Sequence, residues 1–116
     1  MLDLKIYQEE RPWGVFRQFI HNEPCTVKII TVKPKQFLSL QSHNKRSEFW
    51  RIIGGSGKVQ IGEDIFTVKK DDEYNIPVNT KHRLMGGDSV LEVLEISIGD
   101  FDENDIIRYE DKYGRK

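Results

Sequence analysis

The sequence lacks the features that mark several large classes of protein. Only one of its 116 residues is a cysteine, Cys25, which excludes an internal disulfide framework and fits a reducing compartment. No stretch approaches the roughly 20 apolar residues of a membrane-spanning helix. Every apolar run near the start is broken by a charge within a few positions, unlike a secretory signal. The sequence therefore predicts a cytoplasmic protein with no membrane partner.

An excess of charge of one sign is also missing. Lys and Arg number 18 against 19 for Asp and Glu, which gives a net charge of −1. Proteins that bind nucleic acids usually carry a basic excess, so this balance predicts no nucleic-acid partner. Hydrophobic residues make up 37% of the chain, which is lean but too rich for a disordered protein. The length fits one domain, residues 1–116.

The chain does contain many short segments of β-branched and aromatic residues separated by turn formers. Such segments predict β-strands. They lie at residues 15–20, 26–32, 37–43, 47–53, 58–61, 65–68, 73–76, 82–85 and 90–98. Many short strands at this spacing indicate an antiparallel sandwich, jelly roll or barrel, here from about residue 14 to residue 99. Residues 100–116 are charged and do not alternate, which predicts an irregular C-terminal extension or one short helix around 102–109.

The most informative stretch is residues 38–50, LSLQSHNKRSEFW. Gln41 and His43 are two positions apart, so on a strand their side chains leave the same face. Glu48 follows a short loop that can return its carboxylate to that face, and His82 opens a later strand. Two imidazoles, a carboxylate and an amide oxygen suit a divalent first-row metal with room left for water or substrate. Gln41, His43, Glu48 and His82 are therefore candidate metal ligands, with ordinary surface or core positions for the histidines as the alternative.

Other polar and aromatic residues have plainer interpretations. His21 lies in a turn between two predicted strands, which indicates solvent exposure. Trp50 should share the face of Glu48, either at the floor of a pocket or in the core. Glu92 and Glu95 have opposite parity on the last long strand, so at most one of them faces the pocket, and we expect a solvated position for each.

Two segments resemble the metal-binding motifs of the cupin superfamily. They are residues 38–55, LSLQSHNKRSEFWRIIGG, and residues 71–86, DDEYNIPVNTKHRLMG. A glutamine at the position of Gln41, where most cupins have a histidine, is typical of the type II mannose-6-phosphate isomerase domains. Those domains often form the C-terminal part of bifunctional mannose-1-phosphate guanylyltransferases. The transferase part of those enzymes is not among the matched segments, so guanylyl transfer is not implied.

The narrower resemblance runs in register from Arg11 to Arg115. Its further segments are RPWG at 11–14, VKIITVKP at 27–34, KHRL at 81–84, LEVLEISIG at 91–99, DIIR at 105–108 and EDKYGR at 110–115. The cupin motifs usually have glycine at the positions of Lys35, Asp71 and Asn79. Those turns must therefore be made here by residues that tolerate left-handed backbone geometry less well than glycine does. The resemblance implies an all-β fold, the cupin double-stranded β-helix or jelly-roll barrel.

The resemblance also implies a function. It is that of a metal-dependent isomerase that interconverts mannose 6-phosphate and fructose 6-phosphate through an enediolate. The divalent ion would be zinc first, with manganese, cobalt, nickel or iron as alternatives. Lys28 and Arg46 would be catalytic, with Lys28 as the base if loss of water favours its neutral amine. The sugar phosphate would be bound by Arg46, Arg83 and Lys81, because arginine and lysine form charge-assisted hydrogen bonds with phosphate.

Two other functions stay open at this point. A small cupin of this kind can bind a sugar or sugar nucleotide in polysaccharide biosynthesis without isomerase activity. Two histidines and a carboxylate also suit the iron of a non-haem oxygenase, although Gln41 and the sugar-phosphate resemblance weigh against it. Jelly-roll cupins commonly pair through strands or N-terminal arms, which predicts a homodimer.

Overall fold

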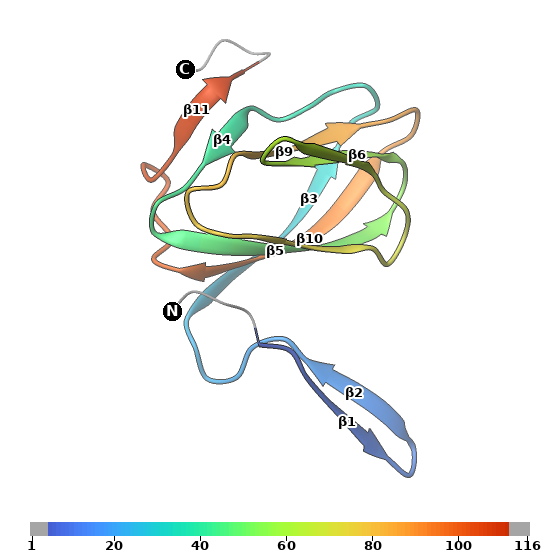
Figure 1. The fold of residues 1–116 in the computed structure, drawn as a ribbon. Helices are drawn as coiled ribbons and strands as arrows, with labels where there is room; N and C mark the ends of the chain where they lie inside the picture. The colour runs from blue at the N-terminus through green and yellow to red at the C-terminus, as the bar shows by residue number, and fades with distance from the viewer. Residues whose placement is uncertain (1–4, 112–116) are drawn as a thin grey trace.

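The computed structural model describes residues 5–111, and all regular structure within them is β (Figure 1). Eleven strands follow one another along this part of the chain. They are β1 (Tyr7–Arg11), β2 (Gly14–Gln18), β3 (Cys25–Val32), β4 (Leu40–Ser42), β5 (Arg46–Gly54), β6 (Gly57–Ile61), β7 (Asp64–Thr67), β8 (Glu73–Ile76), β9 (His82–Gly86), β10 (Leu91–Gly99) and β11 (Ile107–Glu110). Residues 5–111 contain no helix of the length and apolarity needed to cross a membrane.

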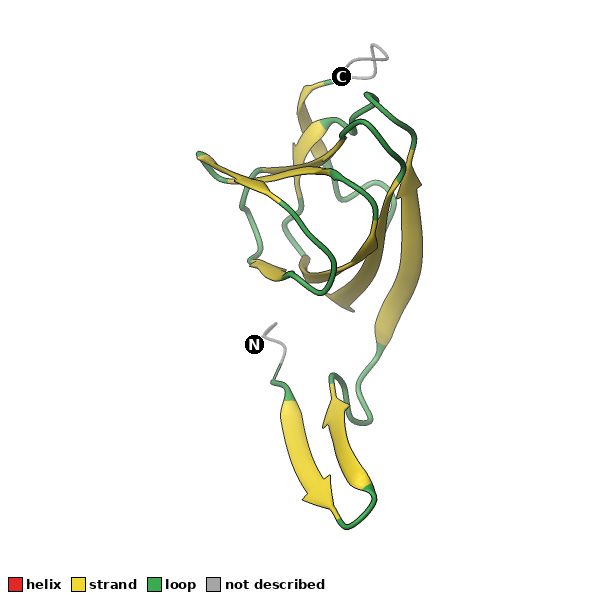
Figure 2. Ribbon diagram, turned by 90° about the vertical axis from the view of Figure 1, so that its right-hand side faces the viewer, coloured by secondary structure: helices red, strands yellow, loops and turns green. Residues whose placement is uncertain are grey.

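Two antiparallel sheets form the barrel and enclose its core (Figures 1 and 2). One has the strand order β3-β10-β5-β8 and the other the order β11-β4-β9-β6-β7. The expected all-β jelly roll is therefore confirmed. The barrel strands run from Cys25 to Glu110, later at both ends than the expected 14–99.

Strands β1 and β2 form a separate hairpin that extends away from the barrel (Figure 2). Arg17 of the hairpin donates two hydrogen bonds, of 2.7 and 3.0 Å, to the Glu73 carboxylate on β8. Phe19, just after the hairpin, packs on Phe49 at 5.4 Å between ring centroids. These contacts fix the base of the hairpin to the outer face of the four-stranded sheet.

The C-terminal segment differs from the prediction of a helix around 102–109. Ile107–Glu110 form strand β11, which pairs with the short strand β4. The charged composition hid this strand because it is an edge strand with mostly polar side chains, so it has little apolar alternation. The last quoted part of the resemblance, residues 112–115, lies outside the described residues.

The barrel interior changes from apolar to polar along its length. Residues directly opposite one another on paired strands share a face, so β3, β10 and β5 present their inner side chains in rows. The rows are Ile30, Val93 and Ile52, then Lys28, Glu95 and Trp50, then Thr26, Ser97 and Glu48. The apolar end holds the main core, in which Ile52 and Val93 are fully buried. The polar end is the place where a site can form.

Tight turns hold the strands in register. Lys35, Asp71 and Asn79 have φ of 60°, 75° and 59°, the left-handed geometry expected where the cupin motifs carry glycine. Gly55 ends the first motif with φ of 89°, and a Cβ there would overlap the carbonyl oxygen of Val90. Side chains are thus tolerated at three of these turns, whereas Gly55 is required sterically.

Candidate metal centre

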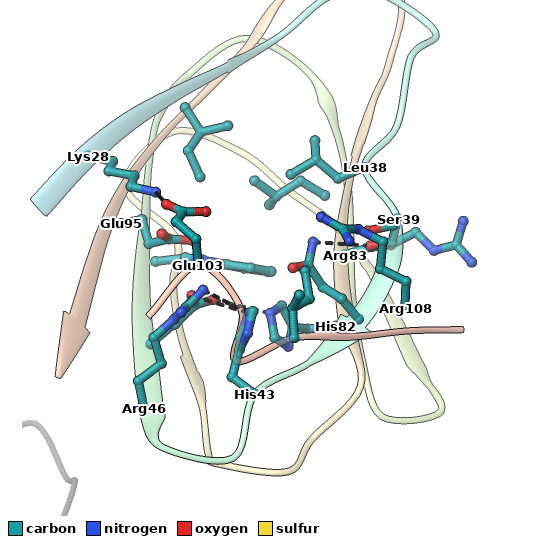
Figure 3. A pocket seen from close by; sticks show the side chains of 16 residues that line it. Lys28, Leu38, Ser39, His43, Arg46, His82, Arg83, Glu95, Glu103 and Arg108 are labelled. Carbon is teal, nitrogen blue, oxygen red and sulfur yellow. Dashed lines mark hydrogen bonds and ion pairs between the residues drawn. The ribbon is translucent and has the colours of Figure 1, made fainter. Parts of the chain in front are cut away.

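A cavity of about 310 Å³ opens at the polar end of the barrel (Figure 3). Both sheets and the segment between β10 and β11 contribute to its wall. The lining residues are Lys28, Ile30, Leu38, Ser39, Gln41, His43, Arg46, Glu48, Trp50, His82, Arg83, Leu84, Glu95, Glu103, Ile106 and Arg108. Every expected ligand faces this one cavity, although the sequence distributes them over 42 positions, from Gln41 to His82.

His43, Glu48 and His82 form a compact, buried cluster. Glu48 Oε2 lies 3.7 Å from His43 Nε2, and Glu48 Oε1 lies 3.2 Å from His82 Nε2. One ligand atom from each residue falls within 4.8 Å of the others, so a single ion could contact all three. All three side chains are less than 5% exposed.

Backbone carbonyls set the orientation of both imidazoles. His43 Nδ1 donates to the carbonyl of Asp105 at 2.7 Å, and His82 Nδ1 donates to the carbonyl of Thr80 at 2.8 Å. Each ring therefore turns its Nε2 toward Glu48, and this nitrogen carries no hydrogen in the neutral form that binds a metal. Glu48 Oε1 is buried and has no hydrogen-bond partner among the described residues. Glu48 Oε1 and His82 Nε2 are acceptor atoms that face each other at 3.2 Å, and such a pair fits a cation, so this donor set suits a divalent metal.

The electrostatics of the cluster agree with that assignment. Burial by itself raises the pKa of Glu48, but His82, His43 and Arg46 outweigh it and lower the pKa to about 2. Burial lowers the pKa of His43. A carboxylate that is ionised and an imidazole that is neutral near pH 7 are the forms that bind a metal.

Gln41 lies beside the cluster. It is directly opposite His82 in the pairing of β4 with β9, so the two side chains share a face. Its amide nitrogen donates a long hydrogen bond of 3.4 Å to the carbonyl of Ser39, and the amide oxygen takes no part in that hydrogen bond. Gln41 could therefore offer its oxygen as a fourth ligand.

Arg46 places a cation next to the proposed ligands. Its Nε lies 3.3 Å from Glu48 Oε2, and its Nη2 lies 3.2 Å from His43 Nε2. The guanidinium also lies over the ring of Phe101, at 4.3 Å from the centroid. Arg46 is 8% exposed, so its charge acts at short range on the cavity.

The other expected cationic residues differ in their position relative to the cavity: Lys28 and Arg83 line it, and Lys81 does not. Lys28 faces the cavity, but its side chain is 43% exposed and its ammonium lies 3.8 Å from Glu103. Arg83 lines the cavity and pairs with Glu110 at 3.0 Å. Lys81 is exposed, lies over the ring of Tyr109 and does not line the cavity. It directly precedes His82 on an extended chain, so its side chain leaves by the other face.

Sequence reasoning missed two polar residues of the cavity wall. Glu95 was expected to be solvated, yet it is 7% exposed and accepts a hydrogen bond of 3.1 Å from Trp50 Nε1. Burial, together with repulsion from Glu48, raises the pKa of Glu95 to about 7. Arg108 was not among the expected site residues, but it lies opposite Gln41 on β11 and its buried Nε has no partner within residues 5–111. The signal for Glu95 was its parity with Ser97 and Val93 on one strand.

The segment between β10 and β11 was also missed as part of the site. The Asp105 carboxylate accepts hydrogen bonds of 2.9 Å from the backbone N–H groups of Asn44 and Lys45. The Asp105 carbonyl holds His43, and the Phe101 ring lies between Lys28 and Arg46. This segment therefore shapes the loop that carries the proposed ligands. The pattern DIIR at 105–108 could have pointed to it only through the resemblance.

His21 and Trp50 agree with their sequence interpretation. His21 is exposed and contacts only its neighbour Asn22 among the described residues. Trp50 is 2% exposed, belongs to the core and also lines the cavity, so it serves both of its expected roles. Glu92 is exposed, as expected.

Comparison with known proteins gives a family and a group of relatives. The family model described as mannose-6-phosphate isomerase C-terminal matches residues 3–111. The xanthan biosynthesis protein XanB of Xanthomonas campestris is 39% identical over 113 residues, which cover 96% of this chain and 24% of XanB. A mannose-1-phosphate guanylyltransferase of Salmonella montevideo is 39% identical over 107 residues, 90% of this chain and 23% of that protein. The chain thus spans about a quarter of the length of these relatives.

Solved structures share the fold. A cupin protein from Bacteroides fragilis superposes with a TM-score of 0.61 at 18% identity, over 70% of this chain and 74% of that one. This likeness confirms the expected cupin barrel and carries no functional information at such identity.

Proposed function

Because the chain belongs to the mannose-6-phosphate isomerase C-terminal family of cupins, we propose that it is a metal-dependent sugar-phosphate isomerase. Its substrates in this proposal are mannose 6-phosphate and fructose 6-phosphate. The observation that carries the proposal is the buried cluster of His43, Glu48 and His82 at the base of a cavity that also holds arginines. Such a cavity offers a cation and anion-binding groups to the same small molecule.

The proposed metal ligands are Gln41, His43, Glu48 and His82. Zinc is our first choice of ion, and manganese, cobalt, nickel or iron would suit the same donors. A bound divalent ion would act as a Lewis acid that stabilises negative charge on substrate oxygens during enolisation. The lowered pKa of His43 and the lowered pKa of Glu48 favour the metal-binding forms of these two groups before any ion arrives.

The phosphate group would bind to the arginines of the cavity. We propose Arg46 and Arg83 for this role and add Arg108, whose buried Nε lacks a partner among the described residues. An arginine N–H that has no acceptor in a buried wall is costly unless a ligand supplies one. Lys81 drops out of the proposal because its ammonium lies over Tyr109, outside the cavity wall.

Lys28 and Arg46 were the expected catalytic residues. Arg46 suits stabilisation of developing negative charge, since its guanidinium lies within 3.3 Å of the proposed ligands. Lys28 pairs with Glu103 at the more exposed edge of the cavity, and an amine must be neutral to accept a proton. Its placement therefore suits contact with an anionic substrate better than proton abstraction.

A coupled assay on the purified protein tests the proposal. Metal content is measured first, and conversion of mannose 6-phosphate is then followed for the wild type, Glu48→Ala, His82→Ala and the control His21→Ala. We expect turnover in the wild type and in His21→Ala, and its loss together with the metal in the other two. Turnover that survives both ligand substitutions would refute the metal mechanism.

The same experiment separates the alternatives. A metal-loaded protein that binds mannose 6-phosphate or a sugar nucleotide without turnover would favour a binding cupin of polysaccharide biosynthesis, the field of relatives such as XanB. Oxygen consumption by an iron-loaded form would favour an oxygenase, since two histidines and one carboxylate are the ligands of such enzymes.

We also propose a homodimer. Val27 and Ile29 on the outer face of edge strand β3 are 57% and 62% exposed, and Trp13 at the hairpin tip is 74% exposed. Val27 and Ile29 lie two positions apart on β3 and so share a face, and exposed apolar side chains of this kind mark a surface that another chain can cover. A cytoplasmic location stays a prediction from the sequence.

A further inference from the structure

Glu95 occupies a central position in the wall of the cavity. On β10 it lies directly opposite Lys28 of β3 and Trp50 of β5, so its side chain points into the barrel. Figure 3 shows it on the same side of the cavity as Lys28 and Glu103. β10 is one of the two inner strands of its four-stranded sheet, so it holds this carboxylate on a rigid support.

The contacts of Glu95 leave one of its oxygens available. Oε2 accepts a hydrogen bond from Trp50 Nε1 at 3.1 Å. Within residues 5–111 this is the only hydrogen bond of the carboxylate, and no ion pair reaches it. The Trp50 ring in turn meets His82 edge-on at 5.5 Å between centroids. The indole therefore fixes Glu95 relative to a proposed metal ligand without occupying Oε1.

The other carboxylates that line the cavity are committed elsewhere. Glu48 contacts His43, His82 and Arg46 and is itself a proposed metal ligand. Glu103 has a side chain 79% exposed and pairs with Lys28. Among the lining residues that can accept a proton, Glu95 is thus buried, oriented and free of a cation at contact distance.

We propose that Glu95 is a catalytic residue that carries the proton between C2 and C1 of the sugar phosphate. This inference rests on the proposed isomerase function and adds the proton carrier to it. Glu95 takes the proton from C2 of the aldose, and the C–H electron pair becomes the C1–C2 double bond. The carbonyl π pair moves onto O1, which gives the enediolate.

The second half of the reaction reverses these movements at the other carbon. Glu95 returns the proton to C1, which takes the electron pair of the double bond, and a carbonyl forms at C2. The hydroxyl proton of O2 ends on O1. The sum is an isomerisation, so no oxidant, reductant or further reactant is required.

The test compares the wild type with Glu95→Gln, which keeps the shape of the side chain and removes the basic oxygen. Glu92→Gln is the matched control, because Glu92 is exposed on the same strand. Conversion of mannose 6-phosphate is measured in H₂O and in D₂O, with deuterium in the product read by mass spectrometry. Metal content and binding of mannose 6-phosphate are measured on each variant.

We expect kcat to fall by about 10²–10⁴-fold in Glu95→Gln, as is typical when a general base is removed. Metal content and substrate binding should stay within about twofold of the wild type, and Glu92→Gln should match the wild type throughout. Should Glu95→Gln not fold, Glu95→Asp withdraws the carboxylate by one methylene, and kcat should fall at least about tenfold with the metal retained.

Three outcomes would overturn the inference. One is a Glu95→Gln, or failing that a Glu95→Asp, with wild-type kcat. Another is a Glu95→Gln protein that takes up deuterium from D₂O into the product at the wild-type rate, which shows that a different group moves the proton. A wild type that converts neither sugar phosphate refutes the proposed function and the role of Glu95 with it, whereas an active wild type with an active Glu95→Gln refutes the role of Glu95 alone.

Discussion

Glu48 Oε1 lies 3.2 Å from His82 Nε2, and the other ring nitrogen of His82, Nδ1, donates to the Thr80 carbonyl. Two acceptors this close are stabilised by a cation between them. We predict that zinc at 100 times its dissociation constant raises the free energy of unfolding by about 2.7 kcal/mol. Thermal unfolding of the wild type with and without the metal measures this.

Substitution of a proposed ligand should abolish that stabilisation. We expect His43→Ala to lose the metal-dependent rise in Tm, while His21→Ala, which alters an exposed turn, keeps it in full. An equal rise in His43→Ala would contradict the assignment of the cluster. Titration of the metal by calorimetry provides the affinity of each variant.

Asp105 should matter for stability although it is not a proposed ligand. Its two carboxylate oxygens accept hydrogen bonds from Asn44 N and Lys45 N. Asp105→Asn replaces one acceptor by a donor, so one backbone N–H loses its partner, at a cost of about 1–3 kcal/mol. Urea unfolding measures the loss, and metal affinity should fall with it. The exposed Asp100→Asn is the control, and equal effects of both substitutions would argue against this role of Asp105.

The hairpin contact should weaken in acid. Hydrogen bonds from Arg17 hold the pKa of Glu73 below its ordinary value, with Arg51 adding to the effect. A depressed pKa in the folded state stabilises the fold above the unfolded pKa, and this stability is lost as the pH falls through the folded pKa. We expect the wild type to exceed Glu73→Gln in Tm at pH 7 and to lose this advantage below about pH 4. A difference in Tm that stays constant with pH would exclude this linkage.

Lys35 provides a test of backbone geometry. Its φ of 60° is costly for a residue with a Cβ, whereas glycine adopts it freely. We predict that Lys35→Gly raises the free energy of unfolding by about 1 kcal/mol. Lys33→Gly, two residues earlier and outside the left-handed region, should lower it. Urea unfolding of both variants decides the matter, and a Lys35→Gly protein less stable than the wild type would show that the turn is not strained.

The proposed dimer is tested by light scattering. We expect twice the monomer mass at micromolar concentration for the wild type and a monomer for Ile29→Glu, since a charge on β3 opposes burial of that face. Ile65→Glu is the matched control, because Ile65 is 57% exposed but lies on β7 in the other sheet. A monomeric wild type would contradict the proposal.

Alternation and turn residues located most strands, because a strand with one buried face repeats every two residues. The strands missed were β1, in a hairpin away from the core, and β11, a polar edge strand. Neither strand has a row of buried apolar side chains, so neither shows the two-residue alternation of apolar residues in the sequence. The proposed ligands were found because Gln41, His43 and Glu48 are close in sequence and chemically distinctive.

The sequence by itself determined the fold class, the family and the set of proposed ligands, since these depend on local alternation, turn chemistry and motif spacing. Beyond the expected Lys28, Arg46 and Arg83, only the tertiary structure decided which charged side chains join them. Glu95, Arg108 and Asp105 come from separate strands and loops that meet only through the pairing of β10 with β5 and of β11 with β4. Whether a glutamate on a strand is solvated or buried depends on which residues pack over its face. For Glu95 these residues, Lys28 and Trp50, are distant in the sequence.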